Sequence, residues 1–213
     1  MQRLRLKFGR GNGLKYVSHL NVLHAWERSF RRADLPLAYS QGFTPHPQIS
    51  VAAPLAIGMT SEAELMDVRL TGWLPPQSVT MKLRTQIADG FQLYNTRMVG
   101  LSIPSLQSLV TFAEYSVKLR SQYKQPEVEN AIHALLQKRE VQWHHSRGEK
   151  THYYDLRTLI DDIWIECCEK TDYTLGMRLC CGGTGSGRPE QVITALGFTG
   201  YPQSIHRKKL ILQ

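Results

Sequence analysis

Residues 18–33, SHLNVLHAWERSFRRA, form the segment around which the expected fold is organised. Its apolar side chains recur at intervals of three and four along the chain, as Leu23, Trp26, Phe30 and Ala33. This spacing places them on one face of an α-helix, and Ser18 is a favoured residue for the helix N-cap. The segment therefore predicts an amphipathic helix that begins at about residue 18.

The segments on either side of this helix predict strands and a second helix. Residues 2–8, QRLRLKF, alternate polar and apolar side chains, which is typical of a β-strand. Pro75 and Pro76 stand where a helix tolerates proline, in its first turn. Further strands are expected at 35–40, 48–54, 63–71 and 91–98, with the second helix at 75–88. The order is that of a ferredoxin-like unit, β-α-β-β-α-β, with one more extended stretch between the helices than that order contains.

The second half predicts the same order after a linker at about 100–112. Strands are expected at 114–120, 141–145, 150–156, 162–168, 173–181 and 204–212, with helices opening at Pro126 and at Arg188. The sequence Arg147-Gly148-Glu149 favours a hairpin turn between the second and third of these strands. We therefore predict an α+β protein of two tandem ferredoxin-like units with antiparallel sheets, residues 1–99 and 113–213, the second with an inserted β-hairpin.

The composition is that of a globular protein, with 42% hydrophobic and 21% charged residues. No stretch approaches the roughly 20 apolar residues that cross a bilayer, and no targeting signal is visible, so a soluble cytoplasmic protein without a membrane partner is expected. The formal net charge is +8, and residues 1–100 contribute +6 of it, with 12 Lys and Arg against six Asp and Glu. This basic half favours an anionic partner, most simply RNA, although charge can also serve solubility alone.

The four cysteines occur as two adjacent pairs, Cys167-Cys168 and Cys180-Cys181. Neighbouring residues of a strand point to opposite faces, so each pair offers one thiolate to a given side. Half-buried small residues are the favoured interpretation, and neither a metal nor a cofactor is expected. The chain also lacks the cysteine triplet that holds a catalytic iron–sulfur cluster.

The stretch from Ser40 to Pro47, SQGFTPHP, is the most informative candidate site. Gly42 permits a sharp turn, and two prolines bracket His46. Phe43 is an apolar ring in a polar loop, available either to stack on a nucleic-acid base or to fill the core. An interface for RNA or another anion is expected from this loop and the first helix, with Ser18, Arg28, Arg31, Arg32, Ser40, Gly42 and Phe43.

Two further sets of residues are candidates. The glycine-rich stretch before the last helix offers backbone N–H groups to a phosphate through Gly185, Gly187 and Arg188, or is a plain flexible loop. Histidines and carboxylates could supply acid–base chemistry if they converge, and the candidates are His19, His46, Glu64 and Asp67. A half-buried structural histidine and a polar strand face are the alternatives for these residues.

The motifs of the first half resemble the radical SAM-linked protein family, a domain of unknown function encoded beside or fused to radical SAM proteins. The resemblance runs through 18–20, Arg28, 31–33, 35–43, 45–47, Ser50, 54–55, Gly58, Ser61, Glu64, Asp67 and 188–190. Two positions depart from the family's pattern, which has Asp and Arg where Asn21 and His24 stand. The resemblance implies a radical SAM protein as partner and no established activity.

Three functions follow as hypotheses. The first is an RNA-binding accessory protein that works with a radical SAM enzyme in RNA modification, RNA processing or a ribosome-related function, with no DNA partner. The second is an enzyme in its own right that uses His19, His46 and an acidic residue. The third is a protein–protein adaptor without chemistry.

Overall fold

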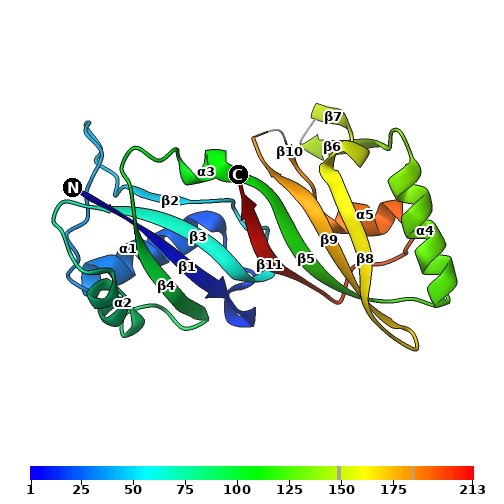
Figure 1. Cartoon of the computed structure of the whole chain (residues 1–213), viewed down its shortest axis with the longest axis horizontal. Helices are drawn as coiled ribbons and strands as arrows, with labels where there is room; N and C mark the ends of the chain where they lie inside the picture. Colours follow the sequence, from blue (N-terminus) through cyan, green and yellow to red (C-terminus); the bar gives the residue numbers. More distant parts are fainter. Residues whose placement is uncertain (148–149, 184) are drawn as a thin grey trace. The chain divides into compact units, whose positions relative to one another are not determined.

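The computed structural model describes residues 1–147, 150–183 and 185–213. The chain divides into two compact units, Met1–Val110 with Leu212–Gln213, and Thr111–Ile211. The elements of both are labelled in Figure 1. The predicted limits 1–99 and 113–213, and the tandem ferredoxin-like layout, stay predictions.

The first unit has the predicted order of helices and strands. Its elements are β1 (Gln2–Arg10), a 3₁₀ turn (Asn12–Leu14), α1 (His19–Arg32), β2 (Ile49–Val51), β3 (Thr60–Leu70), α2 (Pro76–Arg84), β4 (Phe91–Val99) and α3 (Leu106–Leu109). The strands lie in the order β4-β1-β3-β2, and each neighbouring pair is antiparallel.

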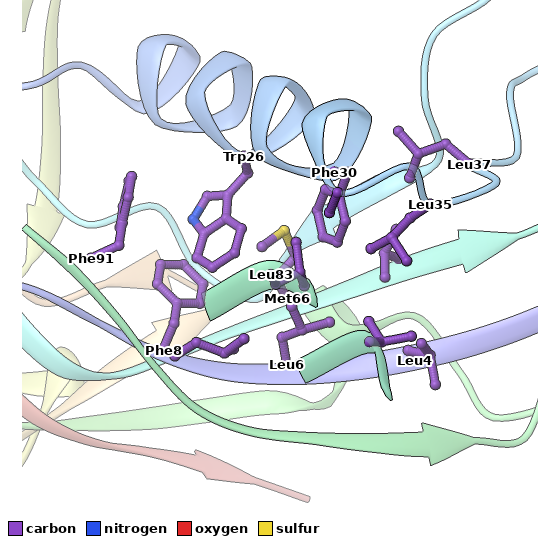
Figure 2. Packing of buried hydrophobic residues seen from close by; sticks show 14 of the residues in the cluster. Leu4, Leu6, Phe8, Trp26, Phe30, Leu35, Leu37, Met66, Leu83 and Phe91 are labelled. Carbon is purple, nitrogen blue, oxygen red and sulfur yellow. The ribbon is translucent and has the colours of Figure 1, made fainter. Parts of the chain in front are cut away.

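The first helix forms as its sequence predicts. The Ser18 hydroxyl accepts a hydrogen bond from the Asn21 N–H, which caps the N-terminus of α1. Trp26 and Phe30 extend from α1 toward the strand that carries Leu6 and Phe8 (Figure 2). The Trp26 ring lies 4.8 Å from the Phe8 ring and 5.2 Å from the Phe91 ring, measured between centroids. An aromatic cluster thus forms the centre of this unit's core.

The two faces of this sheet differ in chemistry. Leu4, Leu6 and Phe8 of β1 belong to the buried hydrophobic cluster under α1 and α2. Because alternate residues of a strand point to opposite faces, Arg3, Arg5 and Lys7 lie on the face away from α1 and α2. The alternation seen in residues 2–8 therefore separates an apolar face from a basic one.

Two expectations for the first unit are wrong in detail. Residues 35–40 form isolated bridges instead of a strand, Leu37 with Leu70 and Tyr39 with Pro47. The reason is that β2 already pairs with β3 at Met66–Val68, which leaves only the end of that edge for Leu37. The expected linker at 100–112 contains α3, whose N-cap Ser105 accepts a hydrogen bond from the Ser108 N–H.

The second unit also combines helices with antiparallel strands. Its elements are β5 (Val110–Arg120), α4 (Gln125–Gln137), β6 (Gln142–Arg147), β7 (Lys150–Asp155), a 3₁₀ turn (Arg157–Leu159), β8 (Ile160–Glu169), β9 (Asp172–Gly182), β10 (Gly185–Ser186), α5 (Pro189–Ala195) and β11 (Ser204–Leu212). β9 pairs antiparallel with both β8 and β5, and β11 lies beside β5. β6 and β7 form a separate antiparallel pair, and the predicted turn residues Gly148 and Glu149 lie outside the described residues.

The mixed α+β class is confirmed by both units. Within the described ranges, no helix is long and apolar enough to span a bilayer.

Candidate functional site

The loop of residues 40–47 is closed at its base by backbone hydrogen bonds. The Ser40 N–H donates to the His46 carbonyl at 2.8 Å, and the His46 N–H donates to the Ser40 hydroxyl at 3.0 Å. The bridge between Tyr39 and Pro47 continues this pairing. Ser40 is therefore a closing residue that holds the two ends of the loop together.

Phe43 lies fully exposed at the end of this closed loop. It does not fill the core, which was the alternative to a stacking role. Gly42 beside it has a φ of 143°, a conformation that side-chain residues rarely adopt. The glycine thus permits the turn that holds an aromatic ring in solvent.

The basic end of α1 is joined to the base of this loop. The Arg31 guanidinium forms an ion pair with the Glu27 carboxylate at 2.6 Å, and the Tyr39 phenol and Glu27 both raise the pKa of Arg31. Arg32 donates to the carbonyl of Gln86, after α2, so it anchors the helix. Arg28 is exposed and has no partner within the described residues.

The four acid–base candidates do not converge. Glu64 is buried on the face of β3 that carries Met66 and Val68, and its charge acts on His19. Asp67 lies on the opposite face and is bound by two arginines. His46 is exposed in the loop. Among these four candidates, the electrostatic effect of Glu64 on His19 is the one interaction that the described residues show.

The stability of the protein is expected to depend on pH through His19. Partial burial lowers the pKa of His19, Arg10 adds to this effect, and Glu64 opposes it. A histidine whose pKa is lowered on folding binds its proton more tightly in the unfolded chain. Its contribution to stability is therefore present above the unfolded pKa of about 6.5 and is lost as the pH falls through the lower folded value.

Urea unfolding at pH values between 7 and 5 measures this effect. The unfolding midpoint is expected to fall with pH, and less steeply in His19→Gln. The exposed His46 provides the control, because its imidazole has no ion-pair partner within the described residues and His46→Gln should keep the wild-type pH dependence. The prediction is wrong if the unfolding midpoint of His19→Gln falls with pH as steeply as that of the wild type.

The glycines of the second unit's loop pack against a neighbour. A Cβ at Gly185 would lie 2.7 Å from a methyl group of Leu159, and one at Gly187 would lie 2.9 Å from the Leu159 carbonyl oxygen. Both glycines therefore permit close packing, which favours a structural role. Arg188 is exposed as the N-cap residue of α5 and lines a pocket of about 330 Å³ with Tyr154 and Asp155. Thr184 of this loop lies outside the described residues.

The four cysteines are free thiols that range from exposed Cys167 to buried Cys181. Cys168 lies opposite Tyr173 across the antiparallel pair of β8 and β9. The neighbouring thiol and burial raise the pKa of Tyr173 to about 12. The Tyr173 hydroxyl donates to the Tyr123 carbonyl at 2.9 Å, so it remains a protonated donor in the core.

The sequence analysis did not single out Arg3 and Arg5, which lie on the basic face of the first unit's sheet and bind the candidate residue Asp67. Asp67 accepts hydrogen bonds from Arg3 and Arg5, and the three side chains are each about nine-tenths or more buried. Arg3 also donates to the carbonyls of Ile103 and Pro104. The alternation of residues 2–8 carried a signal for this cluster, since it placed three basic side chains on one face.

One protein-family model matches most of the chain. Residues 3–189 match the model described as "Uncharacterized protein conserved in bacteria" (DUF2344). No curated protein matches the chain.

Two solved structures show the extent of the fold similarity. A chain of "Crystal Structure of a Cbf5-Nop10-Gar1 Complex" has a TM-score of 0.53 and 10% identity over 97% of this chain and 48% of that chain. A chain of "Crystal structure of the archaeal box H/ACA sRNP Nop10-Cbf5 complex" has a TM-score of 0.45 and 11% identity over 96% and 46%. This chain thus spans about half the length of both. The first likeness supports the α+β fold and, at this identity, nothing more.

Proposed function

The chain belongs to the family of uncharacterized proteins conserved in bacteria (DUF2344), and from that premise we propose that it is an RNA-binding protein that holds single-stranded RNA on its first unit. The observation that carries the proposal is the fully exposed ring of Phe43 on a closed loop beside the basic end of α1. An aromatic ring exposed in this way offers a platform for a base, and nearby guanidinium groups attract the backbone.

The closed loop supports the proposal energetically. A ring on a mobile loop loses conformational freedom when it stacks, whereas one on a pre-ordered loop loses less. Four backbone groups are already paired at the base of this loop, from Ala38 to Gln48. Arg28 adds a positive charge without a competing carboxylate within the described residues.

Replacement of Phe43 by alanine tests this proposal. Stacking of a base on an aromatic side chain is worth about 1–3 kcal/mol, so Phe43→Ala should weaken binding by roughly fivefold to more than a hundredfold. The measurement is a fluorescence anisotropy titration of labelled oligouridine at fixed salt. Wild-type affinity should also fall steeply as salt rises.

Trp73→Ala is the matched control, since Trp73 is another exposed aromatic residue of the first unit. Both variants remove exposed rings, so their melting temperatures should stay close to that of the wild type. The proposal fails if Phe43→Ala binds RNA as well as Trp73→Ala does, or if wild-type binding is absent or insensitive to salt.

Two finer statements belong to the same proposal. We propose that the protein acts as an accessory to a radical SAM enzyme in RNA modification, RNA processing or a ribosome-related function. The support is the resemblance of its Ser18–Leu20 and Ser40–Pro47 motifs to the radical SAM-linked family. We also propose that both units are ferredoxin-like, which the antiparallel order β4-β1-β3-β2 of the first unit supports.

A further inference from the structure

We infer that a pocket on the face of the first unit's sheet opposite α1 and α2, beside the start of α3, binds a backbone phosphate of the RNA, an inference that rests on the proposed function. The pocket has a volume of about 290 Å³, near the lower limit of small-ligand sites. Its lining includes Arg3, Gln48, Ser50, Asp67, Arg69 and Ser105. All of these side chains belong to the first unit.

Two arginines face each other directly in this pocket. Arg3 of β1 and Arg69 of β3 are opposite residues of an antiparallel pair, and both have the parity of the face opposite α1 and α2. Like charges directly opposite one another across two strands destabilise the pair. An anion bound between the two guanidinium groups would convert this repulsion into attraction.

The carboxylate of the pocket does not compensate both arginines. Asp67 accepts hydrogen bonds from Arg3 at 2.6 and 3.0 Å and from Arg5 at 2.8 and 3.0 Å, so both of its oxygens are engaged. Arg3 and Arg5 thus share one carboxylate, and Arg69 has no ion-pair partner within the described residues, so these three guanidinium groups carry two positive charges more than Asp67 balances.

The Arg69 guanidinium is the group most available to a ligand. Within the described residues it makes one hydrogen bond, a long one of 3.5 Å from Nη1 to the Gln48 side-chain oxygen. Arg69 is also only partly buried, unlike Arg3. An arginine fork with unused donors is well suited to phosphate, which it can bind through two parallel hydrogen bonds.

A serine hydroxyl adds a neutral donor to the same pocket. The Ser50 oxygen accepts a hydrogen bond from the Gln107 side-chain amide at 2.6 Å. A hydroxyl that accepts in this way keeps its own proton for donation. Arg69 and Ser50 can therefore donate to the same phosphate, one as a charged and one as a neutral group.

The pocket adjoins the base of the loop that carries Phe43. The Gln48 side-chain amide donates to the Tyr39 carbonyl at 3.1 Å, while the backbone carbonyl of Gln48 accepts from the Arg69 N–H at 3.0 Å. Gln48 thus contacts both the loop base and the pocket. Gln48 therefore links the loop of Phe43 to the phosphate pocket. An RNA strand that stacks one base on Phe43 could place a backbone phosphate in this pocket.

The test combines binding and NMR measurements on the full chain. The probe is a uridine decamer with a 5′-hydroxyl, so that only backbone phosphates are present, and inorganic phosphate is titrated separately. Both should shift the Arg69 Nε–H resonance. Arg69→Gln should weaken decamer binding about tenfold, as expected for a charged hydrogen bond, and should lower the slope of log affinity against log salt by about 0.7.

The matched control is Arg84→Gln, which removes an exposed positive charge from α2 and should change affinity less than twofold. Equal affinities of Arg69→Gln and Arg84→Gln would overturn the inference while the proposed function stands. A shift with inorganic phosphate but not with the decamer would also overturn it, since the site would then serve a free phosphate. Absence of any decamer binding by the wild type would overturn both proposals.

Discussion

Asp67→Asn is expected to lower the free energy of unfolding by about 3–5 kcal/mol. Asp67 is 4% exposed and is the shared partner of Arg3 and Arg5, each 5% exposed. Asparagine keeps the shape of the side chain but removes its charge, so two buried guanidinium groups lose their counterion. A charge without a partner in the interior is costly because burial removes its hydration.

Urea unfolding followed by tryptophan fluorescence measures this loss. Asp34→Asn is the control, since the same chemical change falls on an exposed residue with a φ of 52°, a conformation that asparagine tolerates. It should alter stability by no more than about 0.5 kcal/mol. If Asp67→Asn does not fold, the triple variant Arg3→Met, Arg5→Met, Asp67→Leu should recover a folded protein, because removal of a whole buried ion cluster is often neutral. A loss below about 1 kcal/mol for Asp67→Asn contradicts the prediction.

Trp26→Ala is expected to cost about 3–5 kcal/mol through the cavity that it leaves. The Trp26 side chain is fully buried and contacts the rings of Phe8, Phe30 and Phe91 (Figure 2). Its neighbours come from two strands and one helix, so the surrounding structure cannot close over the space without moving several elements.

Trp26→Phe distinguishes the effect of lost side-chain volume on stability from the effect of the indole N–H. The Trp26 N–H is buried and has no hydrogen-bond partner within the described residues. Phenylalanine removes this unpaired donor and keeps an aromatic ring, so its cost should be clearly smaller than that of alanine. Equal losses of stability in the two variants, measured by thermal unfolding, would contradict the assignment of Trp26 to the centre of the core.

Local sequence patterns predicted most elements of the fold. The helix α1 follows from the spacing of its apolar residues and from the Ser18 cap, and both are properties of neighbouring positions. The strands predicted at 162–168 and 173–181 correspond to β8 and β9, which form an antiparallel pair. The strand predicted at 35–40 does not form, because β2 already occupies the edge of β3 with which it would pair. No local sequence pattern reveals this competition.

The candidate site was predictable only in part. The sequence indicated the loop at 40–47, because glycine and proline favour turns. It also indicated the basic face of α1, because the spacing of charged residues along a helix is a local property. It grouped Glu64 with Asp67 as acid–base candidates, yet three residues of separation along a strand place them on opposite faces. Asp67 therefore stabilises a pair of arginines, while the charge of Glu64 acts on the pKa of His19.

The sequence alone was sufficient for the class of the fold, for most helices and strands, and for the alternation that gives β1 one apolar and one basic face. These depend on contacts between residues a few positions apart. The pocket depended on tertiary structure, since Arg3 and Asp67 are 64 positions apart and meet only because β1 and β3 are neighbours in the sheet. The packing of the whole unit sets the strand order and the register. The strand order and register in turn determine which buried charges meet, and therefore where the proposed phosphate pocket forms.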